Sequence, residues 1–548
     1  MSLMSALYVG ASGLVTSQNS LNTTAHNIAN TDTAGYTRQQ VAQSDIQYNV
    51  IKNNMDSVSK QQLGLGVAYT STRQVRDVFL DQTYRQESGR SAFYDVSYDA
   101  LLQIENVLGE SSNNTYKDTI NNLWTSVQEL AKNPEDAVNQ GLFVQRCNQF
   151  LEQSNMVYDE INSYQKNLNE QIKNNVETIN KYGQQIKELN DAIRKIESGK
   201  VENANDLKDQ RNLLVDKLAE LANITYDSDV FGNTTIQIEG VQFVSSETVN
   251  PIGLYRDGSG FYTPYWEMMA GTLLDADGNE IPDLSNSKVV NTDRTISSEY
   301  NTDLGKLESL LYARGDHVAN YTDLAEDKYG HIENSILMNV QAEFDQLFHA
   351  IVTTVNDTLA DASDPALGYL TNPDGSPIQM FELIGHDAYT YDAGTDTWTK
   401  NPENPENTAT LFSVGNVLIN SDLMKQPTLL GFVKPDGSSD YETAKKLVEA
   451  FDEEAYILNP NLQTKAKFSD YYINLVTQVA NSGSVYKNLS EAQQKTVDST
   501  ESARQAVLGV SSDEELSFMI KFQNAYNANS RYINAVNELL DTLVNGLV

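Results

Sequence analysis

The chain has 548 residues, of which 40% are hydrophobic and 21% charged, so it can form ordinary cores and is not disordered as a whole. Its 75 acidic and 38 basic side chains give a net charge of −37. This argues against nucleic acid and anionic membranes as partners, since both bind basic surfaces. Cys147 is the only cysteine, which excludes an intramolecular disulfide and a cysteine-based metal cluster.

Both ends of the chain are predicted to form amphipathic helices with one narrow apolar seam. Side chains recur every seven residues, as in coiled coils, at Leu7, Leu14, Leu21, Ile28, Met519, Tyr526, Ile533 and Leu540. Such helices are marginal alone in water. We therefore expect the two ends to pair antiparallel, with Leu7 beside Leu540 and Ile28 beside Met519, in a terminal coiled-coil assembly domain of residues 1–40 and 509–548.

The alternative is that these are two ordinary core helices packed on the main body of the protein. Between Met1 and Thr37 the only formal charge is Asp32. A surface so poor in charge is typical of one that is buried in an assembly, which favours the first interpretation.

The middle of the chain carries the stronger helical signal. Apolar residues recur at spacings of three and four without a break over 155–198, and a second helix is predicted over 203–221. Further helical runs lie at 303–360, 440–455 and 467–508, and a break between helices is expected at Asn133-Pro134. Together these predict a helical rod domain that comprises residues 41–223, 303–361 and 440–508.

Two segments contain short alternating runs separated by turn pairs such as Asp-Gly, which predict β structure. They are a β-rich inserted domain at 224–302 and a second, smaller β-rich insertion at 362–439. The predicted fold class is α+β and multidomain: a long helical coiled-coil rod built from both chain ends, with inserted β-rich domains.

The residue patterns indicate no catalytic, cofactor-binding or metal site. The five histidines lack the spacing of a zinc motif, and His317 and His331 are interpreted as surface or packing residues on helical stretches. Asp275, Asp277 and Glu280 are interpreted as a hairpin turn and not a calcium loop. The tripeptide Arg314-Gly315-Asp316 occurs in adhesive proteins, but such triplets are common by chance.

After the first helix the sequence reads NIANTDTAGYTRQQV, which resembles the signature of the bacterial flagellar axial family of rod, hook and hook-associated proteins. The matching residues are Asn27, Ile28, Ala29, Asn30, Thr33, Gly35 and Tyr36. Longer runs resemble the hook-associated protein 1 branch of that family, in its order along the chain. They are RDVFLDQTYRQESG, NLWTSVQELAKNPEDAVNQGLFVQRCNQFLEQSN, DLKDQRNLLVDKLAELANITYD, LGKLESLLYARGD and DEELSFMIKFQNAYNANSRYINAVNELLDTLVN. The resemblance covers nearly the whole chain and is weakest at 362–440.

The resemblance implies a non-enzymatic structural protein at the junction between hook and filament, needed for filament assembly. The implied partners are further copies in a homo-oligomeric ring, the flagellar hook protein, the next junction protein, and a cytoplasmic export chaperone at the C-terminal helix. It also implies an extracellular location reached through the flagellar type III channel.

The sequence shows no pattern of a secretory signal or of a membrane span. The first residues are not a basic stretch followed by an apolar core, and no apolar run approaches about 18 residues. We therefore expect no cleaved signal peptide and no membrane insertion.

Three alternatives remain open at this point. The chain could be another axial protein, such as the hook, distal rod or second junction protein, although the rod at 155–198 and the run RDVFLDQTYRQESG argue against this. It could be an enzyme of the flagellar machine, such as a wall-cleaving hydrolase, or a surface adhesin that acts through its β-rich insertions.

Overall fold

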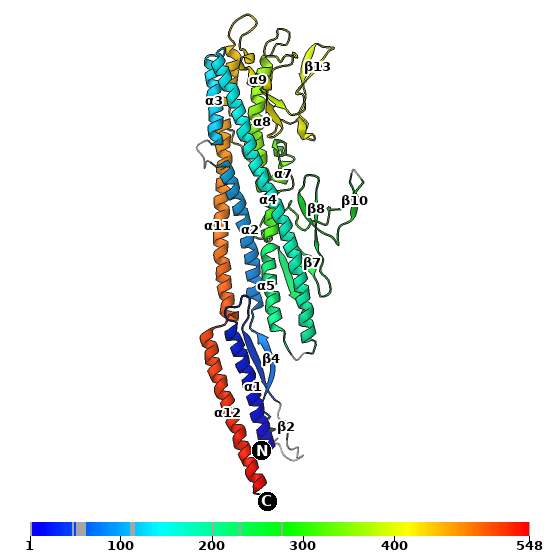
Figure 1. Cartoon of the computed structure of the whole chain (residues 1–548), viewed down its shortest axis with the longest axis vertical. Coiled ribbons are helices and arrows are strands. Elements are labelled where there is room, and N and C mark those ends of the chain that lie inside the picture. The colour runs from blue at the N-terminus through cyan, green and yellow to red at the C-terminus, as the bar shows by residue number, and fades with distance from the viewer. Residues whose placement is uncertain are drawn as a thin grey trace.

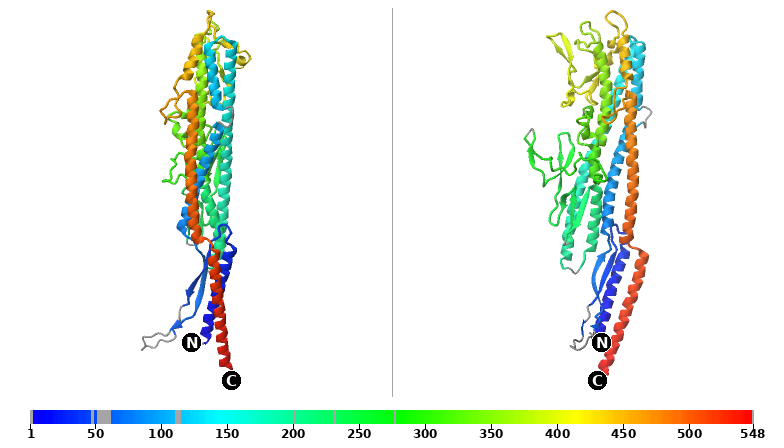
Figure 2. Two further views of the ribbon diagram at one scale, coloured as in Figure 1. Left: turned by 90° about the vertical axis from the view of Figure 1, so that its left-hand side faces the viewer. Right: turned by 180° about the vertical axis from the view of Figure 1, so that it is seen from behind.

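The protein is a long helical rod with a shorter unit of two helices at one end, where both termini lie (Figure 1). The computed structural model describes all residues except 1–2, 47–48, 51–61, 110–114, 200–201, 230–231, 276–277 and 547–548. The fold class is α+β and multidomain, as the sequence predicted, with β modules that project from one side of the rod (Figures 1 and 2).

The two helices of the terminal unit are α1 (Leu3–Ala29) and α12 (Ser512–Asn545). The rod contains α2 (Val78–Leu108), α3 (Tyr116–Lys132), α4 (Ala137–Glu197), α5 (Asn205–Leu221), α6 (Lys306–Arg314), α7 (Tyr329–Ile332), α8 (Ile336–Ala362), α9 (Ser421–Lys425), α10 (Tyr441–Asp452) and α11 (Phe468–Leu508). The described residues also form the short 3₁₀ helices η1 (Tyr321–Leu324), η2 (Thr408–Thr410) and η3 (Pro427–Leu430).

The strands fall into three groups. The first group follows α1 in the chain and contains β1 (Gln39–Asp45), β2 (Asn49–Val50), β3 (Gln62–Leu63) and β4 (Val67–Gln74), of which β1 and β4 pack on α1. The first β module contains β5 (Ile224–Ser228), β6 (Thr234–Ile238), β7 (Val241–Val244), β8 (Ile252–Arg256), β9 (Tyr262–Trp266), β10 (Thr272–Leu274) and β11 (Glu280–Pro282). The second contains β12 (Phe381–Leu383), β13 (Tyr389–Asp392), β14 (Thr397–Lys400) and β15 (Val417–Ile419).

Helix α4 is the spine of the rod and packs against α3, α5, α6, α8 and the first β module. Asp136 caps its first turn by accepting a hydrogen bond from the Val138 amide, and α3 ends at Lys132, so the break expected at Asn133-Pro134 is present. Its apolar residues at spacings of three and four are buried along most of its length, among them Phe143, Phe150, Ile161, Leu168, Ile172, Val176, Ile179, Ile186 and Ile193. Each such side chain contributes about 1.5–3 kcal/mol by leaving water.

The rod is closed by α11, which runs antiparallel to α2. The Ser91 hydroxyl donates to Gln494 Oε1 at 3.3 Å, and the rings of Tyr94 and Tyr486 meet edge to face at 6.2 Å. At the far end of α2, the Tyr472 hydroxyl donates to the Leu108 carbonyl at 2.7 Å. This pairing joins segments about 400 residues apart in the sequence.

Both β modules consist of small antiparallel sheets. In the first, β5-β6-β7 form a three-stranded sheet and β8-β9 a hairpin. Phe243 and Trp266 from these strands are fully buried against the rod, with their rings 6.2 Å apart. The second module pairs β12 with β15 and β13 with β14. The β10-β11 hairpin confirms the turn expected around Asp275, whereas Asp277 lies outside the described residues.

Two of our expectations are wrong. The helical run expected over 303–360 is interrupted, because Gly315 ends α6 with a positive φ of 74° and α8 begins only after the Ser335 cap. The boundary at residue 40 between terminal and rod domains is also wrong, because it falls inside β1. Strands β1 and β4 pair with each other and pack on α1, although Gln74 at the end of β4 also donates to Asp209 Oδ1 of α5 in the rod at 2.7 Å. Among the described residues, no helix is long and apolar enough to cross a membrane.

Two glycines of α4 allow a matched test of packing on the spine. We expect Gly183→Ala to destabilise the protein by about 1–3 kcal/mol, the usual cost of overpacking, because a Cβ there would lie 2.4 Å from the buried Phe243 ring. Gly141→Ala meets nothing closer than 3.9 Å and should gain up to about 1 kcal/mol from helix propensity. Chemical denaturation of both variants measures the difference, and equal midpoints would contradict this packing.

Candidate functional site

The two ends of the chain form one antiparallel helix pair with the N- and C-termini together (Figure 2). Glycines set how closely the helices approach. A Cβ at Gly10 would lie 2.8 Å from Ile533 Cγ1, and one at Gly13 would lie 2.7 Å from the Asn529 side chain. The helices therefore touch backbone to side chain at these two levels, which fixes their register.

This register differs from the one expected from the heptads. Since Gly10 lies level with Ile533, a step of three residues toward the N-terminus of α1 brings Leu7 level with Val536, which is buried. The expected match of Leu7 with Leu540 is therefore wrong by about one helical turn. The heptad argument aligned the largest side chains, whereas the smallest residues of α1 determine the fit.

The eight predicted seam residues all lie on α1 or α12, and all are half-buried within one chain. The fully buried positions of α1 are instead small or polar: Ala6, Gly10, Thr16, Ser17, Ser20, Thr24 and Asn27. Helix α1 buries one face on α12 and another on the β-hairpin. The seam leucines Leu7, Leu14 and Leu21 are only half-buried by these contacts.

The family-motif residues tie the end of α1 to the hairpin. Asn27 is 1% exposed, and its amide nitrogen donates to the Gln39 carbonyl at 2.9 Å. Its Oδ1 accepts from the Gln39 amide at 3.0 Å and from the Tyr36 hydroxyl at 2.8 Å. Gly35 has a φ of 78°, where a side chain would be strained, and the chain reverses there beside Leu213.

The other motif residues end the helix or take no part in the hydrogen bonds around Asn27. The Asn30 side chain donates to the His26 carbonyl at 3.0 Å, and the Asn30 carbonyl accepts from the Thr33 amide. Ile28 is half-buried and Ala29 is exposed. The motif thus specifies a helix end and a tight return, and sequence reasoning missed Gln39 as its central partner.

The joint between the terminal unit and the rod is held by ion pairs of low exposure. Arg38 Nε donates to Glu515 Oε1 at 2.9 Å, and the Arg38 amide donates to the Leu508 carbonyl at 2.8 Å, so the residue just before β1 clamps the junction of α11 and α12. On the rod side, the Thr37 amide donates to Asp209 Oδ2 at 3.1 Å. Burial raises the pKa of Asp209 to about 6.

The outer surface of the helix pair carries many exposed apolar side chains. They are Met4, Tyr8, Val15, Leu516, Ile520, Tyr532, Leu539, Leu543 and Val544, each at least 42% exposed. Isolated exposed apolar residues are ordinary, but a series of them along one narrow helix pair marks an interaction surface. These side chains are the apolar part of the helix pair that a single chain leaves uncovered.

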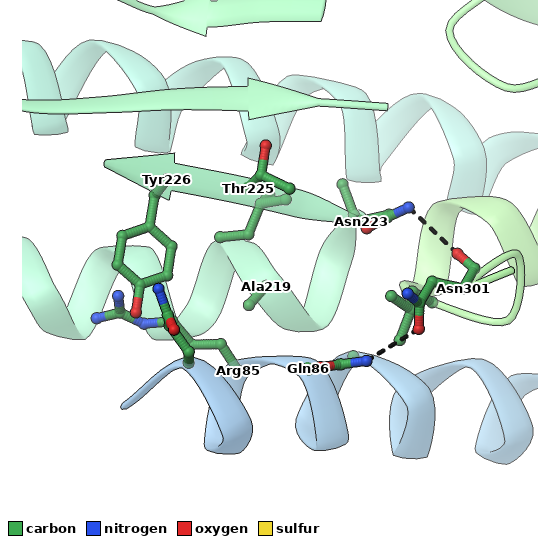
Figure 3. A pocket seen from close by; sticks show the side chains of 12 residues that line it. Arg85, Gln86, Ala219, Asn223, Thr225, Tyr226 and Asn301 are labelled. Atoms are coloured by element: carbon green, nitrogen blue, oxygen red, sulfur yellow. Dashed lines mark hydrogen bonds between the residues drawn. The ribbon is translucent and has the colours of Figure 1, made fainter. Parts of the chain in front are cut away.

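A separate pocket of about 270 Å³ lies between α2, α5 and β5 (Figure 3). Arg85 lines it, but its Nε already donates to Asp216 Oδ1 at 2.6 Å and its guanidinium stacks on the Tyr226 ring at 4.2 Å. Gln86 Nε2 donates to Asn301 Oδ1 at 2.9 Å across its mouth (Figure 3). The described lining residues include no histidine, carboxylate or thiol, and the cation that lines the pocket, Arg85, is already paired with Asp216.

The tripeptide at 314–316 is not displayed as an adhesive loop. Arg314 is 2% exposed, and its Nη1 donates to Asn169 Oδ1 at 2.6 Å and to the Tyr262 carbonyl at 2.8 Å. His317 lies in the loop after α6, not on a helix as we expected, and His331 lies in the short α7.

Comparisons with known proteins agree along the chain. Residues 101–366 match the family described as flagellar hook-associated protein FlgK helical domain. Residues 505–546 match the flagellar basal body rod FlgEFG protein C-terminal family, and residues 7–37 match the flagella basal body rod protein family.

The chain is also similar to whole proteins of this kind. It is 26% identical over 543 residues to flagellar hook-associated protein 1 of Bacillus subtilis (strain 168), covering 97% of this chain and 96% of that protein. It is 25% identical over 580 residues to the protein of the same name from Escherichia coli (strain K12), covering 99% and 100%. The solved flagellar hook junction protein FlgK from Burkholderia pseudomallei has the same fold, with a TM-score of 0.53, 14% identity and coverage of 78% of this chain and 100% of that one.

Cysteine pairs can test the register of the helix pair in the full chain. We expect Gly10→Cys with Ile533→Cys to form a disulfide under mild oxidation, since the Cβ position at residue 10 lies 2.8 Å from Ile533 Cγ1. Leu7→Cys with Leu540→Cys should remain reduced, being about one turn out of register. Cys147 is buried and does not compete. Non-reducing gels and thiol titration report the result, and the reverse outcome would restore the heptad register.

The joint can be tested by removing its arginine. Arg38→Ala leaves Glu515, whose side chain is 3% exposed, without its closest cation. Because Arg38 is itself partly exposed, we expect docking of the terminal unit to weaken by about 1–3 kcal/mol, less than for a fully buried pair. Limited proteolysis at 509–511 should accelerate. The exposed Arg73→Ala is the control, and equal cleavage rates in the two variants would contradict a clamping role.

Proposed function

This chain is a homologue of flagellar hook-associated protein 1 along nearly its full length, and from that premise we propose how it works in the bacterial flagellum. It is a structural protein that forms the junction between hook and filament and is needed for filament assembly. It acts through protein–protein contacts and not as an enzyme.

The apolar surface of the terminal helix pair is the observation that carries this proposal. Nine large apolar side chains of α1 and α12 are at least 42% exposed in one chain, and the seam residues between them are half-buried. Helices from neighbouring copies cover these side chains in a homo-oligomeric ring. The hook protein lies on one side of that ring and the next junction protein on the other.

The terminal unit and the β modules have separate roles in this arrangement. Residues of both chain ends form the inner, assembling part, while the rod and its two β modules project away from it (Figure 1). The seam residues Leu14 and Ile533 belong to the assembling part. The buried position of Arg314 removes the sequence argument for an adhesive tripeptide, so we do not assign adhesion to the rod.

We further propose that the protein reaches the cell exterior through the flagellar type III channel. Before export, a cytoplasmic chaperone covers α12, whose apolar stripe is the natural ligand of a hydrophobic groove. The free thiol of Cys147 and the acidic net charge of −37 are compatible with passage as an unfolded, soluble chain.

Deleting the gene tests the proposed position. We expect bare hooks by electron microscopy and flagellin lost to the medium by immunoblot, because filament subunits have no junction on which to assemble. Reintroducing the intact gene should restore filaments. Normal filaments on the deletion strain would overturn the proposal.

A matched pair of substitutions separates assembly from folding. Ile520 in α12 is 61% exposed and Ile473 in α11 of the rod is 38% exposed, so an aspartate at either position costs little in the isolated chain. We expect Ile520→Asp to abolish incorporation into the hook–filament junction, because it places a charge in the apolar contact between copies. Ile473→Asp should assemble normally. Circular dichroism checks that both fold, and motility with equal incorporation of both variants would contradict the assembly surface.

A further inference from the structure

Two histidines and three aspartates from four separate segments meet where the first β module joins the rod. Asp316 and His317 lie in the loop after α6, Asp323 in η1, His331 in α7, and Asp293 in the segment that follows β11. Residues 293 and 331 approach one another only because the β module folds back on the rod. The cluster is partly exposed and open to small solutes.

The centre of the cluster is the carboxylate of Asp316. Its Oδ1 lies 2.7 Å from His317 Nδ1 and its Oδ2 lies 2.9 Å from His331 Nε2. The two imidazole rings are nearly parallel, with centroids 6.2 Å apart and an interplanar angle of 6°. One ligand atom from each of these three residues lies within 4.8 Å of the others. Two imidazole nitrogens and a carboxylate oxygen therefore converge on one small volume.

The outer nitrogens of both rings face further carboxylates. His317 Nε2 lies 3.4 Å from Asp323 Oδ2, and His331 Nδ1 lies 3.4 Å from Asp293 Oδ1. Asp323 is itself held by the Asn320 amide at 2.9 Å. Histidines that bind metals usually donate their second N–H to a carboxylate or carbonyl, which fixes the ring and strengthens the ligand. Both histidines here already have that outer partner.

We propose that Asp316, His317 and His331 bind one divalent transition-metal cation of the zinc type. Two imidazoles and a carboxylate suit zinc, and are unlike the all-oxygen sites of calcium and magnesium. Three protein ligands leave a fourth position for water. The ligand atoms must move apart by about 0.5 Å to reach zinc bond lengths of ~2.0–2.2 Å, which the exposed loop and short helix permit.

Binding would fasten the β module to the rod, because the ligand His331 is oriented by Asp293 from the module side. The competing arrangement is a chain of ion pairs without metal. The hydrogen bond to Asp316 raises the pKa of His317 to about 9, so a metal ion must displace a proton from this ring. A direct measurement of metal content distinguishes the metal-bound cluster from the chain of ion pairs.

Zinc chloride added to the metal-free full chain provides the test. We expect isothermal titration calorimetry to give one zinc ion per chain, with a rise in the thermal midpoint. His331→Ala should lower the affinity at least 100-fold, and Asp323→Asn about 10–100-fold, as for other outer partners of metal-binding histidines. His386→Ala, which removes an exposed histidine away from the cluster, should bind zinc as the unaltered chain does.

Cobalt(II) adds a readout that does not depend on stability. Its visible absorption should show a four-coordinate spectrum in the unaltered chain and in His386→Ala, and lose it in His331→Ala. Circular dichroism checks that each variant is folded. The proposal is overturned if the unaltered chain takes up no zinc at millimolar concentration, or if His331→Ala and Asp323→Asn both bind as tightly as the control variant.

Discussion

The antiparallel pairing of the two chain ends is the constraint on which the rest of the structure depends. Helix α11 packs antiparallel to α2, and α12 packs antiparallel to α1. Each segment between α2 and α11 must therefore start from the rod and return to it. The β modules satisfy this by leaving and re-entering the rod on one side (Figure 2). The aromatic layers of the upper rod, such as Tyr116 against Tyr472, then connect the early and late parts of the chain in one core.

Sequence patterns predicted the elements whose burial is apolar and periodic. The spine α4 buries apolar residues at spacings of three and four and begins at the Asp136 cap, and the first half of the closing helix α11 buries Phe468, Tyr472, Leu475 and Val479 at the same spacings. The hairpin of β1 and β4 gave no such signal. Its runs QQVAQSD and VAYTSTRQ are mainly polar, since many of their side chains are exposed and others bond polar groups, as in the 3.3 Å hydrogen bond from Gln43 to Ser20 of α1.

The candidate site was predicted only in part, because its apolar residues follow a periodic pattern and its small and polar residues do not. The seam residues lie on the two helices that pair, and their role in assembly stays a prediction. The register of the pair depends on Gly10 and Gly13, which carry no hydrophobic signal. The role of Asn27 could not be assigned from its neighbours, since its partner Gln39 is twelve residues away and meets it only after the chain reverses at Gly35. The histidine cluster gathers residues from 293 to 331 through tertiary packing alone, so the spacing of His317 and His331 predicted no site.

Closure of the rod by its last helices imposes an order on folding. Ser91 and Gln494, which bond across α2 and α11, are 403 residues apart, and a growing chain presents α1 and α2 long before their partners exist. The local packing of α3, α4 and α5 can form at once, whereas the long-range pairs wait for the final segment. Such high contact order slows folding, although loop closure over this span costs little more free energy than over a shorter one. Helices α1 and α2 therefore lack their partners until the chain is complete. A copy cut short before α11 keeps both of these helices but never gains α11 and α12 to cover them.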